Sequence, residues 1–299
     1  MKIRFLMRLL CLTLILNLMA GLPVASALQD DDTRGIWDTG FLKKRKASAS
    51  QSPTRKKIRY KVQTRVEDKK PTLEDLQANK TVVGITFWKW RRSETSDDKA
   101  VRILEREDDK ETEWTPVRVE SDTLFAPGDR VRLSFESPRT GYLYVINRET
   151  YSDGTSSEPH LIFPTMKDYG GDNYVQAGRV IDIPRTKFVL KSNSAKYSGE
   201  EVTFLFSPTK LTEVSVPDKM TKLPAAQVQK WEEMWRTAKV ERYELDEGKG
   251  KAYTKAEKEA GESATRLLTQ EDELPQTLIV LDAKPDSPIL FTLQMKLRK

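Results

Sequence analysis

The sequence predicts a mainly β fold, and three observations lead to this prediction. Short runs of β-prone residues recur between residues 81 and 206, and the loops between them hold glycines and prolines that favour turns. Outside the first 27 residues the chain has no cysteine, so a packed core instead of disulfide bonds has to stabilise it. Many short strands at this spacing favour an antiparallel, immunoglobulin-like β-sandwich, with a distorted barrel as the second choice.

Residues 1–27 have the order of a cleavable signal peptide. Lys2, Arg4 and Arg8 precede or open an apolar stretch from Leu9 to Leu18, and the small residues at 25–27 fit a cleavage site. An uncleaved anchor would need roughly 20 apolar residues, and this run is shorter. No later segment is long and apolar enough to span a bilayer. We therefore expect an exported protein, periplasmic or extracellular, that is not transmembrane and does not meet nucleic acid.

Residues 28–80 are charged and polar, and they predict a disordered basic arm. They hold 14 Lys and Arg against 8 Asp and Glu, whereas residues 81–299 hold 34 against 37. Such a segment buries too little apolar surface to fold by itself, and only Ile36-Trp37 and Phe41-Leu42 could dock it. The arm is either a solvated linker or a weak contact to an anionic surface. That contact would use Lys43, Lys44, Arg45, Lys46, Arg55, Lys56, Lys57 and Arg59.

The folded domain, residues 81–299, is expected to begin with a strand over Thr81–Trp88 that is apolar on both faces. In the run 130–136 apolar and polar residues alternate, which predicts one buried face and one wet face. The turn residues at 137–141 suggest a hairpin with an inner strand over Tyr142–Ile146. Further strands are expected at 161–163, 180–183, 187–190 and 201–206.

The spacing of apolar residues changes to a helical period after Pro208. Pro224 fits the first turn of a helix, and Val228, Trp231, Trp235 and Ala238 then share one face, which we expect to dock on the sheet. A second helix is expected at Thr254, where Glu257 completes a capping box, although Gly261 weakens its middle. These two helices form a helical segment over 224–268. The runs 277–281 and 289–297 predict a C-terminal hairpin over 277–297.

The run from Phe125 to Arg148 reads F-A-P-G-D-R-V-R-L-S-F-E-S-P-R-T-G-Y-L-Y-V-I-N-R, and it resembles the hallmark of a bacterial family known as domain of unknown function 4384. The resemblance continues through Tyr151–Gly154, Leu161–Thr165, Gly170–Asn173 and Gly178, and covers residues 125–208. It implies a portable module of exported proteins, found also beside peptidase-like or kinase-like domains, and not a self-sufficient enzyme. No catalytic residues are established for the family, so the resemblance supplies none.

His160 is the only histidine of the chain, and this limits several mechanisms. A Ser-His-acid triad would need it, but the chain has no G-x-S-x-G motif. A catalytic zinc site usually takes three protein ligands, with histidine or cysteine prominent among them, and residues 28–299 offer one. A thiol nucleophile is lacking there as well. We therefore expect no catalytic residue, no metal and no cofactor.

Other motifs have simpler explanations. Gly248-Lys249-Gly250-Lys251 lacks the P-loop spacing and fits a solvated turn. Asp153-Gly154 and Asp172-Asn173 could offer oxygen ligands to calcium, but turn formation explains both pairs. The adjacent acids Glu200-Glu201 should point to opposite faces of a strand, yet acids on separate elements could still converge.

Aromatic side chains leave more room for a function. Trp88 and Trp90 project to one side of their expected strand, and Trp90 stands among basic residues at a polar strand end. Exposed aromatic groups stack on sugars or anchor a protein partner. We predict a secreted, non-enzymatic binding module of the cell envelope, with a protein or polysaccharide as ligand, and an envelope-directed hydrolase as the alternative. The candidate partner-binding residues are Trp88, Trp90, Tyr151, Asp153, Asp172 and Asn173.

Overall fold

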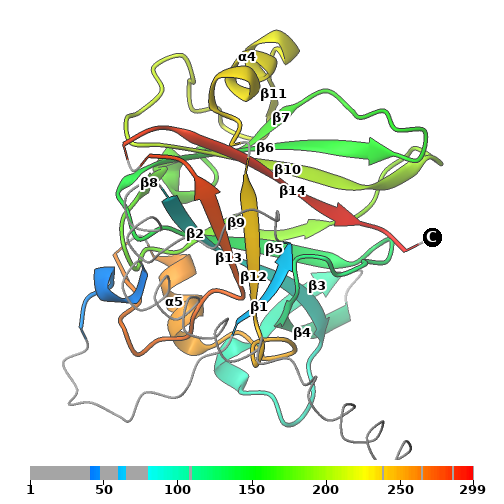
Figure 1. Cartoon of the computed structure of the whole chain (residues 1–299). Helices are drawn as coiled ribbons and strands as arrows, with labels where there is room; N and C mark the ends of the chain where they lie inside the picture. Colours follow the sequence, from blue (N-terminus) through cyan, green and yellow to red (C-terminus); the bar gives the residue numbers. More distant parts are fainter. Residues whose placement is uncertain are drawn as a thin grey trace, which may run out of the picture.

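The computed structural model describes residues 41–47, 60–64, 80–107, 110–237, 239–263, 265–284 and 286–298. The predicted signal peptide and the docking pair Ile36-Trp37 lie outside these residues, as do Arg55, Lys56, Lys57 and Arg59 of the basic arm. Among the described residues, no helix has the length and apolar character to cross a membrane. The chain is mainly β, as predicted, and its strands form two antiparallel sheets (Figure 1).

The larger sheet has eight strands, and β2 (Lys80–Arg92) is its centre. One edge of β2 pairs with β13 over residues 80–85 and with β4 over residues 87–92, while its other edge pairs with β5. The remaining strands extend the sheet from these three neighbours. Its other members are β1 (Tyr60–Thr64), β3 (Ile103–Glu107), β4 (Lys110–Val119), β5 (Arg130–Glu136), β9 (Ile181–Val189), β12 (Val240–Leu245) and β13 (Thr277–Asp282).

The second sheet has six strands around the long pair β6 (Gly141–Tyr151) and β10 (Tyr197–Ser207). Its other members are β7 (His160–Phe163), β8 (Tyr174–Val175), β11 (Thr221–Lys222) and β14 (Ile289–Lys296). The main hydrophobic core contains side chains from both sheets, among them Phe87, Phe135 and Phe204. The two sheets therefore share one core, and each presents its other face outward (Figure 1).

Within the described ranges there are two α-helices, and each outer face carries one of them. Helix α4 (Ala225–Trp235) packs Val228 and Trp231 onto the outer face of the six-stranded sheet, which confirms the predicted docking helix. Helix α5 (Lys255–Glu262) contacts β9 of the eight-stranded sheet, and its predicted capping box is present. Strand β12 lies between them, so the segment 224–268 is not wholly helical. Short 3-10 helices are η2 (Leu42–Lys44), η3 (Lys99–Val101) and η4 (Tyr169–Gly171).

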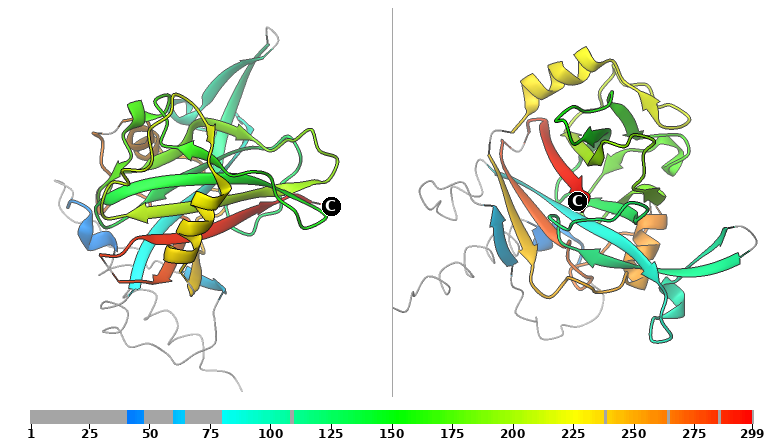
Figure 2. Two further views of the ribbon diagram at one scale, coloured as in Figure 1. Left: turned by 90° about the horizontal axis from the view of Figure 1, so that it is seen from above. Right: turned by 90° about the vertical axis from the view of Figure 1, so that its right-hand side faces the viewer.

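Two predicted hairpins are wrong. Strands β5 and β6 lie in different sheets, because the chain at 137–140 crosses from one sheet to the other instead of reversing within one. Strands β13 and β14 are separated in the same way, and pair with β2 and β10. The runs 180–183 and 187–190 belong to one strand, β9. The hairpin of β3 and β4 projects from the body (Figure 2).

The prediction that one face of β5 contacts solvent is also wrong. Its polar residues Arg132, Ser134 and Glu136 are buried, as are its apolar ones. Charged partners from distant parts of the sequence cover this face, because Asp182 on β9 pairs with Arg132 and Arg45 of the arm pairs with Glu136. Polar residues on this strand therefore belong to an interior layer.

Two stretches of the predicted disordered arm are packed on the body. Phe41 and Leu42 are buried beside Leu245, Leu274 and Leu278, so the expected docking point is confirmed. Strand β1 pairs with β12 and forms one end of the large sheet. Arg45 is buried as well, which removes it from the basic residues expected to meet an anionic surface.

Candidate functional site

The structure places the six predicted site residues in three separate regions. Trp88 and Trp90 lie on β2 and are 1% and 5% exposed, so the exposure that a stacking role requires is not found. Both faces of this central strand are covered, which explains the burial of its tryptophans. The indole N–H of Trp88 donates to Ser134 at 2.7 Å, and the indole packs edge-on against Tyr253.

Tyr151 and Asp153 lie at one end of β6, whereas Asp172 and Asn173 lie at the other end, where β8 pairs with Gly141 and Tyr142. One carboxylate oxygen of Asp153 accepts from Thr155, and Lys196 pairs with the other. These bonds hold the pKa of Asp153 below its usual range. The two ends of β6 are thus separate places, and we describe them in turn.

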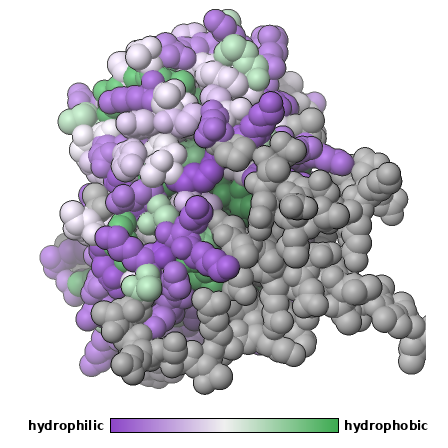
Figure 3. Space-filling model, turned by 60° about the vertical axis from the view of Figure 1, so that its left-hand side comes forward, coloured by the Kyte–Doolittle hydropathy of each residue, from purple (hydrophilic) through white to green (hydrophobic). Residues whose placement is uncertain are grey.

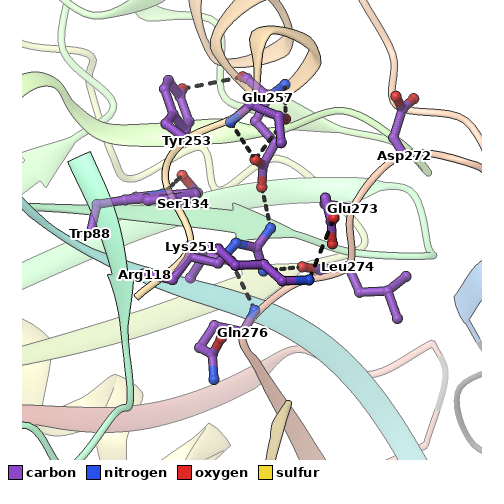
Figure 4. A network of polar contacts seen from close by, with 12 residues as sticks. Trp88, Arg118, Ser134, Lys251, Tyr253, Glu257, Asp272, Glu273, Leu274 and Gln276 are labelled. Atoms are coloured by element: carbon purple, nitrogen blue, oxygen red, sulfur yellow. Dashed lines mark hydrogen bonds and ion pairs between the residues drawn. The ribbon is translucent and has the colours of Figure 1, made fainter. Parts of the chain in front are cut away.

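A buried polar layer lies on the outer face of the eight-stranded sheet, between the sheet and α5 (Figure 4). Burying a charge is costly unless it is paired and hydrogen-bonded, and this layer consists largely of such pairs. The hydroxyl of Tyr253 links its members, because it donates to Asp182 at 2.8 Å and lies near the carbonyl of Glu257. The buried ion pairs are Arg45 with Glu136, Arg118 with Glu257, and Arg132 with Asp182.

Glu257 links the start of α5 to the sheet. One of its carboxylate oxygens accepts from the backbone N–H of Thr254, and the N–H of Glu257 donates back to the Thr254 hydroxyl, which is the capping box expected from the sequence. The other oxygen accepts from Arg118, whose guanidinium also donates to the carbonyl of Leu274 (Figure 4). The same side chain therefore begins the helix and attaches it to β4.

Burial and charge raise the pKa of two members of the layer. Burial, with Asp182 adding to it, raises the pKa of Tyr253 well above its ordinary value. Burial acts to lower the pKa of Arg132, but Asp182, with a smaller contribution from Glu262, acts in the other direction, and the pKa is raised. A cavity of about 20 Å³ beside Trp88, Ser134 and Glu257 has room for about one water molecule.

The polar layer holds a loop of the six-stranded sheet, residues 165–175, which we call the candidate loop. The hydroxyl of Tyr169 donates to the carbonyl of Gly261 in α5 at 2.5 Å and accepts from the backbone N–H of Asp182 at 2.9 Å. Tyr169, Gly170 and Gly171 all have positive φ, at 52°, 63° and 82°. This backbone region is strained for tyrosine and persists only where the surroundings impose it. The loop is therefore held in one shape.

Two further side chains hold the far end of the candidate loop. Asn173 donates from its amide to the carbonyl of Leu143, and the N–H of Leu143 donates back to the carbonyl of Asn173. Arg179 donates to the carbonyl of Tyr174 and pairs with Asp172 at 2.9 Å. Asp172 and Asn173, both predicted site residues, thus position the loop, and the carboxylate of Asp172 is also half exposed.

The fixed candidate loop presents apolar surface to solvent. Met166 is 51% exposed and Tyr174 is 36% exposed, and the ring of Tyr174 packs edge-on against Tyr142. Both side chains belong to the candidate loop, and the sulfur of Met166 lies close to Gly171. The side of the molecule that bears β8 comes forward in Figure 3, where hydrophobic residues form small separate patches among hydrophilic ones.

The opposite end of β6 brings two acids together. Glu149 and Glu200 are direct cross-strand neighbours on β6 and β10, so their side chains share one face. Glu149 accepts from Tyr151 at 3.0 Å and from Ser192 at 2.6 Å. Glu200 is 1% exposed and accepts from Tyr197 and from Asn147. Burial, with Glu149 adding to it, raises the pKa of Glu200 to about 7, although these two hydrogen bonds oppose the shift.

Neither the exposed apolar side chains of the candidate loop nor this acid pair was selected from the sequence. Met166 and Tyr174 carry no motif, and their exposure follows from tertiary structure alone. Tyr169 had one signal, the two glycines that follow it, which fit left-handed backbone. Glu149 had none, because strand register decides which residue faces Glu200. His160, on β7, contacts the carbonyl of Glu158 through Nδ1.

The comparison with protein families confirms the resemblance seen in the sequence. Residues 124–210 match the model described as Domain of unknown function (DUF4384). This range holds the candidate loop and both acids of the pair. No curated protein and no solved structure matches the chain.

Proposed function

We propose, from the premise that residues 124–210 form a DUF4384 domain, that this chain is a non-enzymatic binding module of the bacterial cell envelope. The observation that carries the proposal is the candidate loop, in which fixed backbone presents Tyr174 and Met166 to solvent. A surface that is ordered before it meets a ligand loses less conformational entropy on binding. The polar layer, by holding Tyr169, supplies this order.

The side chains of the surface favour a protein partner. Tyrosine and methionine are enriched in protein interfaces, and Asp172 adds a half-exposed carboxylate at the rim. A polysaccharide would stack on an aromatic ring, and here Tyr174 offers only part of its surface because it packs against Tyr142. The polysaccharide ligand is the competing outcome of the test below.

The test is capture of envelope proteins by the immobilised chain, compared between two matched variants. Tyr174→Ala with Met166→Ser removes the exposed apolar surface of the candidate loop. Met234→Ser removes a similarly exposed methionine from α4 and serves as the control. We expect a protein that the wild type and the control retain and the double variant loses. Equal capture by all three would contradict the proposal, and loss of a glycan in place of a protein would assign the surface to polysaccharide.

Export to the periplasm or beyond belongs to this proposal. It is supported by the order of charged, apolar and small residues in 1–27. Sequencing the amino terminus of the protein recovered from a cell-envelope fraction tests it, with a mature start at Leu28 as the expected result. The immunoglobulin-like arrangement is likewise proposed, and is supported by two antiparallel sheets around a shared core.

A hydrolase is the second candidate, and Glu149 with Glu200 is the observation that favours it. Paired carboxylates with a raised pKa on one partner are typical of acid catalysis. Against this function, Glu200 is buried and both its oxygens accept hydrogen bonds from the protein. Turnover of an envelope glycan or peptide by the wild type, abolished in Glu200→Gln, would establish the hydrolase and overturn the binding module.

A further inference from the structure

Arg45 lies apart from the candidate loop, in a pocket that fits its guanidinium group. The side chain is 2% exposed, although it comes from a basic run whose other described members, Lys43, Lys44 and Lys46, are exposed. Its Nε and Nη2 donate to the two carboxylate oxygens of Glu136 at 2.7 and 2.6 Å. This is the bidentate geometry in which a planar guanidinium meets a carboxylate.

Backbone carbonyls complete the pocket. Nη1 of Arg45 donates to the carbonyls of Thr269, Asp272 and Glu273 at 3.1 to 3.2 Å, and Nη2 also donates to that of Glu273. The segment 269–273 has a turn of its own, because Asp272 accepts from the N–H and the hydroxyl of Thr269. Protein groups outside the arm therefore shape the pocket, and Arg45 fills it.

A lysine would satisfy this pocket poorly. The acceptors are two carboxylate oxygens and three carbonyls around a planar guanidinium, and an ammonium is a compact charge with three donors. The chain itself shows this preference, since two lysines precede Arg45 and one follows it, yet the arginine is the buried residue.

The residues around Arg45 bind the body as a short peptide ligand would, with the helical turn η2 between the apolar residues and the arginine. Phe41 and Leu42 enter an apolar site beside Leu278, and the backbone of residues 45 and 46 continues the contact. The N–H of Gln270 donates to the carbonyl of Lys46, and its side-chain amide donates to that of Arg45, both at 3.0 Å. The recognition pattern is therefore F-L-x-x-R. It consists of two apolar anchors, an arginine three residues after the second anchor, and pairing of the backbone.

We propose that Glu136 and the carbonyls of residues 269–273 form a binding site specific for the arginine of an F-L-x-x-R peptide. The chain fills this site with its own residues 41–47, and the same peptide supplied as a separate molecule exchanges with them. The site recognises a guanidinium through a carboxylate and a set of carbonyls, and it is independent of the surface on the candidate loop.

The first experiment tests the guanidinium specificity in the full mature chain. Arg45→Ala leaves Cβ in place and vacates the volume that N-ethylguanidinium would fill. We expect millimolar N-ethylguanidinium to raise the Tm of this variant. Ethylammonium should need an at least about tenfold higher concentration to raise the Tm equally. In the double variant Arg45→Ala with Glu136→Gln, the preference for the guanidinium over the ammonium should disappear. Equal effects of the two cations, or an unchanged preference without the carboxylate, would overturn the assignment.

The second experiment keeps Arg45 and tests exchange, so it does not depend on the folding of the variant. A protease recognition sequence is inserted between Ala47 and Tyr60, and the folded protein is cleaved there. We expect the amino-terminal fragment to stay bound and to be displaced by excess peptide F-L-K-K-R-K-A. The same peptide carrying Arg45→Lys should need an about tenfold higher concentration to displace the fragment equally. Immediate loss of the fragment, or equal displacement by both peptides, would contradict the proposal.

Discussion

The hydroxyl of Tyr169 joins the candidate loop to helix α5 by donating to the carbonyl of Gly261 over 2.5 Å. The same oxygen accepts from the backbone N–H of Asp182, so one side chain connects elements of both sheets. The positive φ of Tyr169 is retained because this contact fixes its ring.

We predict that Tyr169→Phe lowers the free energy of unfolding by about 1–3 kcal/mol, because it removes a donor and leaves buried partners unsatisfied. Urea denaturation measures this change, and amide hydrogen exchange should rise in residues 165–175. Tyr174→Phe is the matched control, since its ring is partly exposed, and should stay within about 0.5 kcal/mol of the wild type. A similar loss in both variants would show that Tyr169 has no special role.

Gly261→Ala should destabilise the protein, although alanine is the better helix former by about 1 kcal/mol. A Cβ at this position would lie 2.2 Å from a carboxylate oxygen of Asp182 and 2.9 Å from the hydroxyl of Tyr253. The helix would have to move away from the polar layer. Thermal melting should show a lower Tm than the wild type, whereas Lys255→Ala, at an exposed position of α5, should change little. A raised Tm for Gly261→Ala would mean that α5 does not pack this closely.

Glu200 predicts a pH dependence of stability. Its folded pKa of about 7 lies above its ordinary value of 4.5, so the folded state binds more protons than the unfolded state between these values. Stability therefore falls as pH rises from about 4.5 to about 7, by up to about 3 kcal/mol. The carboxylate of Glu200 faces Glu149 on β6, and it accepts hydrogen bonds from Tyr197 and Asn147.

Glu200→Gln tests this pH dependence. The variant should resemble the wild type at pH 4.5 and exceed it in stability at pH 8, because the amide carries no charge to bury. Urea denaturation at both values measures the difference. Glu201→Gln, whose side chain points to the opposite face, should keep the wild-type slope. If the stability of Glu200→Gln fell with rising pH as steeply as that of the wild type, the pH dependence would not come from Glu200.

The exposed lysines of the arm predict a weak, salt-dependent contact with anionic vesicles. Lys43→Ala with Lys44→Ala should reduce retention on phosphatidylserine vesicles at low salt, and the remaining retention should fade near 0.15 M salt, where the screening length is about 8 Å. Co-sedimentation measures this. Lys255→Ala with Lys258→Ala is a control of equal charge change on α5. Equal loss in both variants would assign the contact to net charge and not to the arm.

Local sequence signals predicted elements whose cause is local. Thr254 and Glu257 are three residues apart and form their capping box without help from the rest of the chain. Val228 and Trp231 mark the buried side of α4 by their spacing alone. The motifs from Phe125 onward identified the family over nearly the matched range.

Pairing between distant segments could not be read from the same signals. Alternating polar residues on β5 are compatible with a wet face or with a buried one, and the partner that decides, such as Asp182 for Arg132, lies on another strand. A turn at 137–141 is equally compatible with a hairpin and with a crossing between sheets. Arg45 stood within a basic run, and nothing local distinguished it from its lysine neighbours. The site residues that sequence reasoning missed belong to this non-local class.

The division of one edge of β2 between two partners also bears on how the chain is made. Strand β4 reaches residues 87–92 soon after β2 is synthesised, but residues 80–85 wait for β13, which begins only at Thr277. Until then the nascent polypeptide carries an unpaired apolar strand edge over Val82 and Val83, the kind of surface that promotes aggregation. Ribosome-bound intermediates that end before residue 277 should therefore engage chaperones, and release from them should coincide with the emergence of the last strands.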